Sequence, residues 1–268
     1  MSDGDPGHDR PDLSARHALV TGASSGIGAS IAHELARCGA AVAVNHLHDD
    51  DGAAVVVGEL ESLGADAVAL DGDVADPGAV DAVFSSIDDR WGSIEIVVCN
   101  AGIDGERAEA HELSIDAWRQ VIDVNLTGAF LCARAALGRM IPARRGVVVF
   151  VSSVHEVIPW AGYSAYTASK AGISMLAKTL AMEAAPHGVR VLCVAPGAIA
   201  TAINASARDT EAERRDLRSK IPMDRVGEPS DIATVVADLV SDRSSYVTGT
   251  TVFVDGGMTL YPSFAHGG

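Results

Sequence analysis

Short apolar runs alternate with segments of helical periodicity along this chain, and this alternation most constrains its fold. Residues 17–21 form an apolar run that meets a glycine cluster, and residues 29–38 then show helical periodicity up to Gly39. The same order continues with strands expected at 41–45, 67–70, 94–99, 146–151, 189–194 and 251–254 and helices at 53–63, 80–90, 114–140 and 163–183. Each parallel strand needs a crossover helix, so the pattern predicts an α/β fold: a doubly wound parallel sheet flanked by helices on both faces.

The chain length of 268 residues fits one domain of this kind. Residues 1–13 are acidic and rich in turn formers, so we expect a disordered amino terminus followed by one domain over 14–268. Residues 198–220 are polar and follow a strand end, which favours a lid over a substrate pocket.

Charge and apolar content argue against two classes of partner. The formal net charge is -16, with 36 acidic and 20 basic residues, which would repel a nucleic acid backbone. The purely apolar runs, such as residues 147–151, are too short for a membrane helix, and the amino terminus lacks a secretory signal. We therefore expect a cytoplasmic protein that binds neither nucleic acid nor a membrane.

The cysteines lie far apart, with no CxxC or Cys/His spacing that would indicate a zinc site or a redox pair: Cys38, Cys99, Cys132 and Cys193. We interpret them as small core residues and expect no metal site.

Residues 20–28, VTGASSGIG, place three glycines where a strand meets a helix. Gly22, Gly26 and Gly28 would permit positive φ in the turn, a close approach of a pyrophosphate to the backbone, and tight packing of helix on strand. A tight turn without a ligand is the alternative. The position in the first strand–helix unit favours a nucleotide site.

Tyr166 and Lys170 lie four residues apart in a predicted helix, so their side chains share one face. A cation about 4 Å from a phenol, at an effective dielectric of about 20, favours the phenolate by roughly 4 kcal/mol before desolvation is subtracted. We expect Lys170 to lower the pKa of Tyr166 towards mildly alkaline pH, so that Tyr166 exchanges a proton with an alcohol. Ser153, at a strand end, would hydrogen-bond the substrate oxygen. Taken alone, the pair would be an exposed helical pair.

Four separated motifs together resemble the short-chain dehydrogenase/reductase family: TGxxxGxG in the first turn, CNAG at 99–102, Asn125 in the long helix, and Ser153 with the YxxxK of Tyr166 and Lys170. The resemblance covers the chain from about residue 16 to its carboxyl end. It implies a Rossmann-type fold and an NAD(P)-dependent oxidoreductase. Within the family, residues 152–160 and 245–264 look most like bacterial glucose 1-dehydrogenases.

The resemblance also implies roles for individual residues. Asp73 would accept a hydrogen bond from the adenine amine, although by itself it could equally cap a helix or a turn. Asn125 would hold a water that links Lys170 to solvent. The implied cofactor-binding residues, in addition to Tyr166 and Lys170, are Gly22, Ser24, Gly26, Ile27, Gly28, Asp73, Val74, Asn100, Ala101, Gly102, Pro196, Gly197, Ile199 and Thr201.

The end of the second strand decides between NAD and NADP in such folds, since an acidic residue there favours the free ribose 2′-hydroxyl and a basic one favours the 2′-phosphate. This chain has Asn45, His46, Leu47 and His48 at that place. The aspartates at 49–51 would repel a phosphate if they face inward, whereas a histidine could donate to one. Alternatively, these aspartates form the solvated first turn of a helix. Taken together, the residues at this place favour NAD over NADP.

The substrate is predicted to be an aldose such as glucose, with His155 and Glu156 near its hydroxyls. Asp104, Gly105 and the small residues at 161–165 depart from the glucose dehydrogenase pattern. A ketoreductase for an acyl, steroid or aromatic substrate is therefore an alternative, and a catalytically silent dinucleotide-binding protein is another. Apolar positions on both long helices, which relatives pair across subunits, predict a homotetramer with the tail at 255–264 near a neighbour.

Overall fold

The computed structural model describes residues 10–201 and 210–260 of the chain. Seven parallel strands form one sheet: β1 (His17–Val20), β2 (Ala41–His46), β3 (Ala67–Asp71), β4 (Ile96–Cys99), β5 (Gly146–Val151), β6 (Val189–Pro196) and β7 (Thr251–Val254). Their order is β3-β2-β1-β4-β5-β6-β7. The direction of winding reverses between β1 and β4, which is where ligands bind in open α/β sheets. The predicted doubly wound parallel sheet is confirmed.

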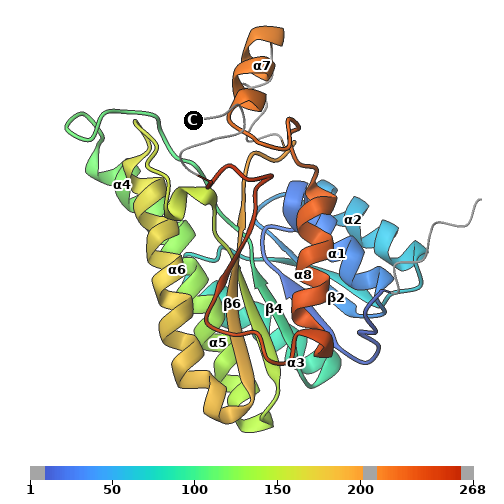
Figure 1. Cartoon of the computed structure of the whole chain (residues 1–268). Coiled ribbons are helices and arrows are strands. Elements are labelled where there is room, and N and C mark those ends of the chain that lie inside the picture. The colour runs from blue at the N-terminus through green and yellow to red at the C-terminus, as the bar shows by residue number, and fades with distance from the viewer. Residues whose placement is uncertain (1–9, 202–209, 261–268) are drawn as a thin grey trace, which may run out of the picture.

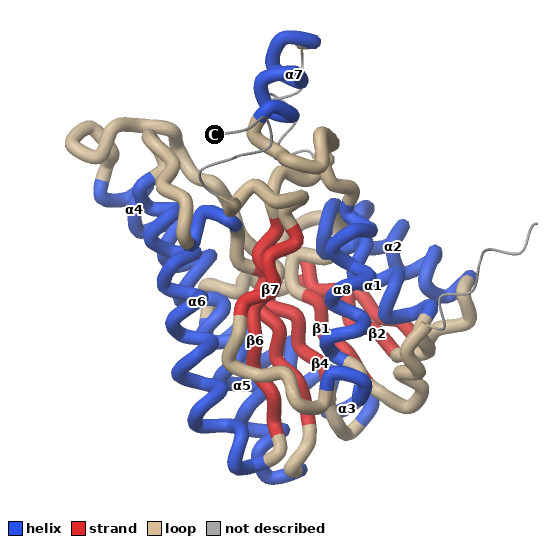
Figure 2. Tube along the Cα trace, viewed as in Figure 1, coloured by secondary structure: helices blue, strands red, loops and turns tan. Residues whose placement is uncertain are grey.

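Helices cover both faces of this sheet: α1 (Gly26–Arg37), α2 (Asp50–Ser62) and α8 (Pro229–Val240) on one side, and α3 (Pro77–Trp91), α5 (Gly128–Ala143) and α6 (Ser164–Ala184) on the other. Figures 1 and 2 show the two layers with the strands between them. Successive residues of a strand enter opposite cores, as Val42 and Val44 pack on the α1 side and Ala43 on the α3 side. This is why the strands appear in the sequence as continuous apolar runs.

The helix predicted over 114–140 is continuous from residue 115 to 143 but is not uniform. It begins as α4 (Ile115–Ile122), widens into a π-helical turn at Asp123–Thr127, and continues as α5. Among the described residues it is the one helix long and apolar enough to cross a membrane, and 44% of its most apolar window is buried. Its Arg139 forms a bidentate ion pair with Asp88 of α3, so α5 packs as a core helix of this fold.

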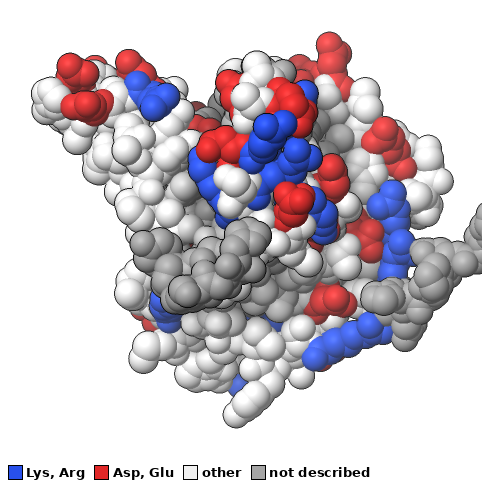
Figure 3. Space-filling view, turned by 45° about the horizontal axis from the view of Figure 1, so that its top comes forward, with Lys and Arg blue, Asp and Glu red and all other residues white. Residues whose placement is uncertain are grey.

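Two helices were not predicted, namely α7 (Glu211–Ser219) and α8. α7 stands beyond the carboxyl end of the sheet in Figure 1. Figure 3 shows that the Lys and Arg residues on this end of the molecule lie beside Asp and Glu, as in the ion pairs of Lys220 with Asp216 and of Arg225 with Asp231.

The packed chain begins before the boundary expected at residue 14. Leu13 is 1% exposed, and its N–H donates to the carbonyl of Cys38 at 2.7 Å. Residues 1–9, residues 202–209 of the lid predicted at 198–220, and residues 261–268 lie outside the described residues. All four cysteines are buried and free, which confirms their interpretation as core residues.

Candidate active site

A cavity of about 1390 Å³ opens at the carboxyl ends of the strands. Every residue predicted for cofactor binding lies in its lining, as do Ser153, His155, Tyr166 and Lys170. Asn125 does not line the cavity but is buried behind it. The topology thus gathers residues that are up to 237 positions apart, from Gly22 to Thr259, around one cavity.

The glycine turn after β1 has the geometry that a pyrophosphate requires. Gly22 and Gly26 adopt φ of 60° and 59°, which favour glycine. A Cβ on Gly28 would overlap the carbonyl oxygen of Gly22 and lie 2.6 Å from Nδ2 of Asn100. Ser25, which caps α1, makes no side-chain hydrogen bond to the helix. Ser25 therefore leaves the amino-terminal N–H groups of α1 open to another acceptor at the wall of the cavity, so these residues fit a phosphate-bearing cofactor.

Asn100 and Thr21 fix the neighbouring CNAG segment against this turn. Nδ2 of Asn100 donates to the carbonyls of Thr21 and Gly22 at 2.9 and 3.1 Å, and Oγ1 of Thr21 accepts from the N–H groups of Asn100 and Ala101 at 3.0 Å. Asp73 accepts from the N–H of Ala75 at 2.8 Å. One carboxylate oxygen of Asp73 is therefore used in its own turn, while the residue still faces the cavity.

Ser153, Tyr166 and Lys170 meet at the other end of the cavity, where β5 ends and α6 begins. Nζ of Lys170 donates to the carbonyl of Val151 at 3.0 Å and lies 5.5 Å from the ring centroid of Tyr166. Oγ of Ser153 accepts from the N–H of His155 at 3.2 Å. The serine, the tyrosine and the lysine therefore converge, as their predicted roles require.

Burial dominates the ionisation of this group. It raises the pKa of Tyr166 to about 12, against the opposing effect of a hydrogen bond with Ser153. It also lowers the pKa of Lys170 to about 8, and Asp104 opposes that shift. In the chain by itself the pKa of Tyr166 thus shifts upwards, opposite to the expected direction, because desolvation of the phenolate outweighs the hydrogen bond with Ser153.

Asn125 lies in the π-helical turn and is 0% exposed. Its Oδ1 accepts from the N–H of Ile103 at 2.8 Å, while Nδ2 donates to the carbonyl of Ile103 at 2.9 Å and to Oγ of Ser169 at 3.1 Å. The side chain of Asn125 thus joins the loop after β4 to the helix that carries Tyr166 and Lys170. Both of its amide hydrogens are used within the protein.

An aromatic group forms the substrate side of the cavity. The ring of Trp160 stacks on His155, with centroids 4.5 Å apart, and meets the edge of Tyr166 at 5.9 Å. Nδ1 of His155 donates to the carbonyl of Ile158 at 3.0 Å, and burial lowers the pKa of the imidazole. Burial also raises the pKa of Asp104 on the facing loop. Glu156, expected near the substrate, instead accepts from Oγ of Ser174 at 2.9 Å and is not part of the lining.

Sequence reasoning missed most of the apolar wall around this group. These additional lining residues are Ile103, Val154, Val157, Ile158, Pro159, Leu217 and Met258. The run VIPW at 157–160 was the available signal, because it is apolar although it follows a strand end where polar loop residues are usual.

A seven-stranded parallel sheet, a glycine turn after its first strand and a Ser–Tyr–Lys group across its switch point define a dinucleotide-dependent oxidoreductase of the Rossmann class. A family model described as Enoyl-(Acyl carrier protein) reductase matches residues 22–259. The chain belongs to the short-chain dehydrogenase/reductase family.

Three relatives illustrate the range of that family. The 3beta-hydroxysteroid dehydrogenase 1 of Eggerthella lenta is 45% identical over 257 residues, which span 96% of this chain and 98% of the relative. The glucose 1-dehydrogenase 2 of Bacillus subtilis is 42% identical over 253 residues, or 94% and 98% of the two chains. The crystal structure of a putative gluconate dehydrogenase from Agrobacterium tumefaciens has a TM-score of 0.89 at 35% identity, covering 92% of this chain and 97% of that one.

Proposed function

We propose that this protein transfers a hydride between a nicotinamide cofactor and a secondary alcohol or ketone carried on an apolar ring. The single observation that carries the substrate class is the wall of the cavity beside Tyr166, which is built from Ile103, Val157, Ile158 and Trp160. Burial of apolar substrate surface against such a wall stabilises the complex, whereas the hydroxyls of a polyol would find no hydrogen-bond partners on it. The similarity to a hydroxysteroid dehydrogenase supports the same class.

The chain's own residues supply proton transfer and positioning. In reduction, the hydroxyl of Tyr166 donates its proton to the carbonyl oxygen as that oxygen gains charge, and in oxidation the phenolate takes the proton back. Ser153 donates a hydrogen bond to the same oxygen. Lys170 holds positive charge beneath Tyr166. A bound nicotinamide supplies or accepts the hydride, and the lining residues from Gly22 to Thr201 would hold the cofactor.

Asn125 acts in this proposal as a positioning residue. Because its two amide hydrogens are used by Ile103 and Ser169, a water that connects Lys170 to solvent would bind the carbonyl groups of the π-helical turn instead of this amide.

A second candidate is the aldose oxidation expected from the sequence. Polar groups that could bind sugar hydroxyls do line the cavity, namely Asp104, Gln120 and His155. His155 donates to Ile158 and stacks on Trp160, however, which leaves fewer donors and acceptors than a polyol needs.

Initial rates of reduced-nicotinamide formation with a cyclic secondary alcohol, a 3-hydroxysteroid and D-glucose, each with NAD and NADP, test both candidates. We expect kcat/KM for a cyclic substrate to exceed that for glucose by at least about tenfold, as one pocket mismatch of about 1.4 kcal/mol gives. Tyr166→Phe is expected to lose about 10²- to 10⁴-fold in rate while still binding NADH. Efficient turnover of glucose in place of the cyclic alcohols would select the second candidate.

The homotetramer also remains a proposal. Met175 and Met182 lie seven residues apart on one face of α6, and Met182 is 82% exposed, while Phe130 of α5 is also exposed. Apolar surface of this kind on two neighbouring helices favours pairing with other copies of the chain. A monomeric mass in sedimentation would contradict it.

A further inference from the structure

The carboxyl ends of β2 and β3 carry acids and histidines but no lysine or arginine. Between Arg37 and Arg90 the sequence contains no Lys or Arg at all, although it contains Asp49, Asp50 and Asp71. His46 and His48 are the only side chains of this stretch that can become cationic. A group with negative charge that approaches this edge therefore meets an acidic field.

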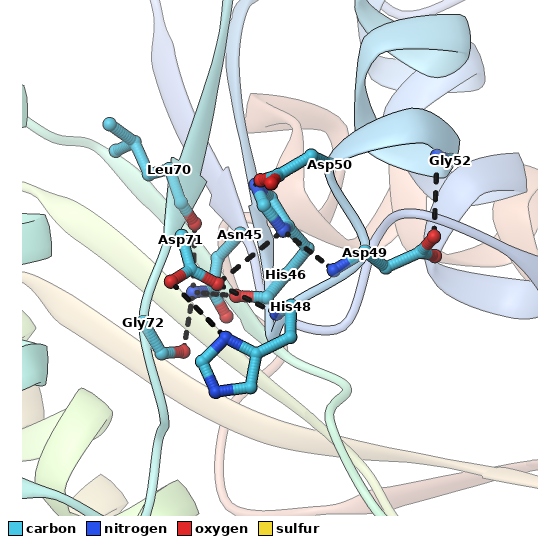
Figure 4. Close-up of polar contacts among 9 residues, drawn as sticks. All are labelled: Asn45, His46, His48, Asp49, Asp50, Gly52, Leu70, Asp71 and Gly72. Atoms are coloured by element: carbon cyan, nitrogen blue, oxygen red, sulfur yellow. Dashed lines mark hydrogen bonds and ion pairs between the residues drawn. The ribbon is translucent and has the colours of Figure 1, made fainter.

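The strand register brings one acid between these two histidines. His46 pairs with Asp71 across β2 and β3, although 25 positions separate them in the chain. Nδ1 of His46 lies 3.6 Å from Oδ1 of Asp71, and Nδ1 of His48 lies 3.6 Å from Oδ2 of the same carboxylate. Oδ1 of Asp71 also accepts from the N–H of His48 at 2.7 Å, which holds His48 at a positive φ of 52°. Figure 4 shows Asp71 linked to both imidazoles.

The imidazole of His46 lies between two carboxylates. Its Nδ1 accepts from the N–H of Asp49 at 3.4 Å, so the ring proton is assigned to Nε2, which faces Oδ1 of Asp50 at 3.8 Å. The ring is 3% exposed. His46 is thus enclosed by the carboxylates of Asp50 and Asp71.

This cluster borders the cavity beside the glycine turn. The N–H of Ala23 donates to the carbonyl of Asn45 at 2.9 Å, and His46 and Leu47, the next two residues, line the cavity. The side chain of Asn45 donates to the carbonyls of Leu70 and Gly72 at 3.2 and 3.0 Å, so it is used to close the edge of the sheet. His46, the last residue of β2, and Leu47 after it are therefore the residues that a bound adenosine ribose would meet.

We infer that this protein selects NAD(H) against NADP(H) and that Asp71, at the end of β3, is the specificity-determining residue, acting through His46 and His48. The inference rests on the proposed function. A 2′-phosphate carries about 1.5 to 2 negative charges near neutral pH. Here it would meet His46 and Leu47 in the cavity wall, with the carboxylates of Asp50 and Asp71 3.8 and 3.6 Å from the imidazole of His46. A free 2′-hydroxyl carries no charge and meets no such repulsion.

The test measures binding of NADH and NADPH to the full chain in the absence of substrate. The fluorescence of the nucleotide reports the binding. We expect the wild type to bind NADH at least about tenfold more tightly than NADPH. Asp71→Asn keeps an oxygen for the His48 N–H but removes the charge, and it should tighten NADPH binding by about fivefold to tenfold, with the Kd for NADH changed less than about twofold. Asp51→Asn is the matched control, since Asp51 lies on the same edge in the first turn of α2 without a contact to His46 or His48 among the described residues. It should change the NADPH to NADH ratio less than about twofold.

Three outcomes would overturn the inference. They are a wild type that binds NADPH as tightly as NADH, an Asp71→Asn variant whose ratio is unchanged, and an Asp51→Asn variant that shifts the ratio as much as Asp71→Asn does. Each of these leaves the proposed oxidoreductase function intact. A protein that binds neither nucleotide would instead overturn the proposed function itself.

Discussion

The two ends of the cavity each enclose a histidine, but they do so in opposite ways. At the adenosine end, defined by Asn45, His46, Leu47, Gly72 and Asp73, the imidazole of His46 lies between two carboxylates. At the catalytic end, defined by Ser153, His155, Trp160, Tyr166 and Lys170, the imidazole of His155 lies against aromatic rings. We therefore propose that one end distinguishes ligands by charge and the other by shape and apolar surface.

The largest effect expected in this comparison is the loss of NADH binding when a glycine of the turn after β1 is replaced, and a control glycine in α2 separates it from effects on the stability of the fold. Gly28→Ala places a Cβ against the Gly22 carbonyl and Asn100, so it should displace the turn and raise the Kd for NADH by about tenfold to hundredfold, which corresponds to about 1–3 kcal/mol of overpacking. Gly58→Ala in α2 is the control, because its Cβ would meet no atom within 4 Å. It should leave NADH binding unchanged and stabilise the fold by about 0.5–1 kcal/mol. Equal effects of the two variants on Kd would contradict the close fit of this turn.

The next effect belongs to the catalytic end, where Lys170 is buried and no carboxylate of the described residues forms an ion pair with it. The pKa of Lys170 is about 8 in the folded chain and 10.5 ordinarily, so between these values the unfolded chain binds a proton that the folded chain does not. The free energy of unfolding should therefore rise with pH from about 8 to about 10.5 and gain nothing from this group below about 8.

Urea unfolding of the wild type and Lys170→Met, without added cofactor, measures this effect. The wild type should gain about 2 kcal/mol relative to the variant between about pH 7.5 and about pH 9.5. Lys178→Met changes an exposed lysine of the same helix and should follow the wild type. A pH slope that survives in Lys170→Met would show that another group causes it.

The smallest expected effect tests whether the shape of the aromatic wall determines substrate binding at the catalytic end. Trp160→Ala removes the ring stacked on His155 and should raise KM for a cyclic alcohol by about fivefold, with the Kd for NADH unchanged. Trp118→Ala in α4 removes an indole that does not line the cavity and should alter neither value. If Trp160→Ala weakened NADH binding as strongly as it weakened substrate binding, the two ends would not be independent.

Most of the fold could be predicted from the sequence because a parallel strand buried on both faces is an uninterrupted apolar run. All seven strands were anticipated, with ends that differ by one or two residues from the structure. α8 was not predicted, although Pro229 and Asp231 mark its start, because its buried positions, Ile232, Ala233, Val236 and Ala237 among them, extend over much of its circumference and weaken the helical periodicity.

The catalytic group was predictable for a local reason. Tyr166 and Lys170 share a helix face by their spacing, and Ser153 follows a recognisable strand, so short-range rules place all three near one edge of the sheet. The side-chain bonds of Asn125 to Ile103 and Ser169 were not predictable in this way, since they depend on how a loop packs against two helices.

The sequence by itself thus determined the strands and the helices between β1 and β6, the glycine turn, and the identity of the serine, tyrosine and lysine, because each depends on residues close in the chain. The tertiary structure decided the ionisation of Tyr166, because desolvation depends on everything packed around the phenol. It also decided the pairing of His46 with Asp71, because the register of two parallel strands follows from the packing of the whole sheet.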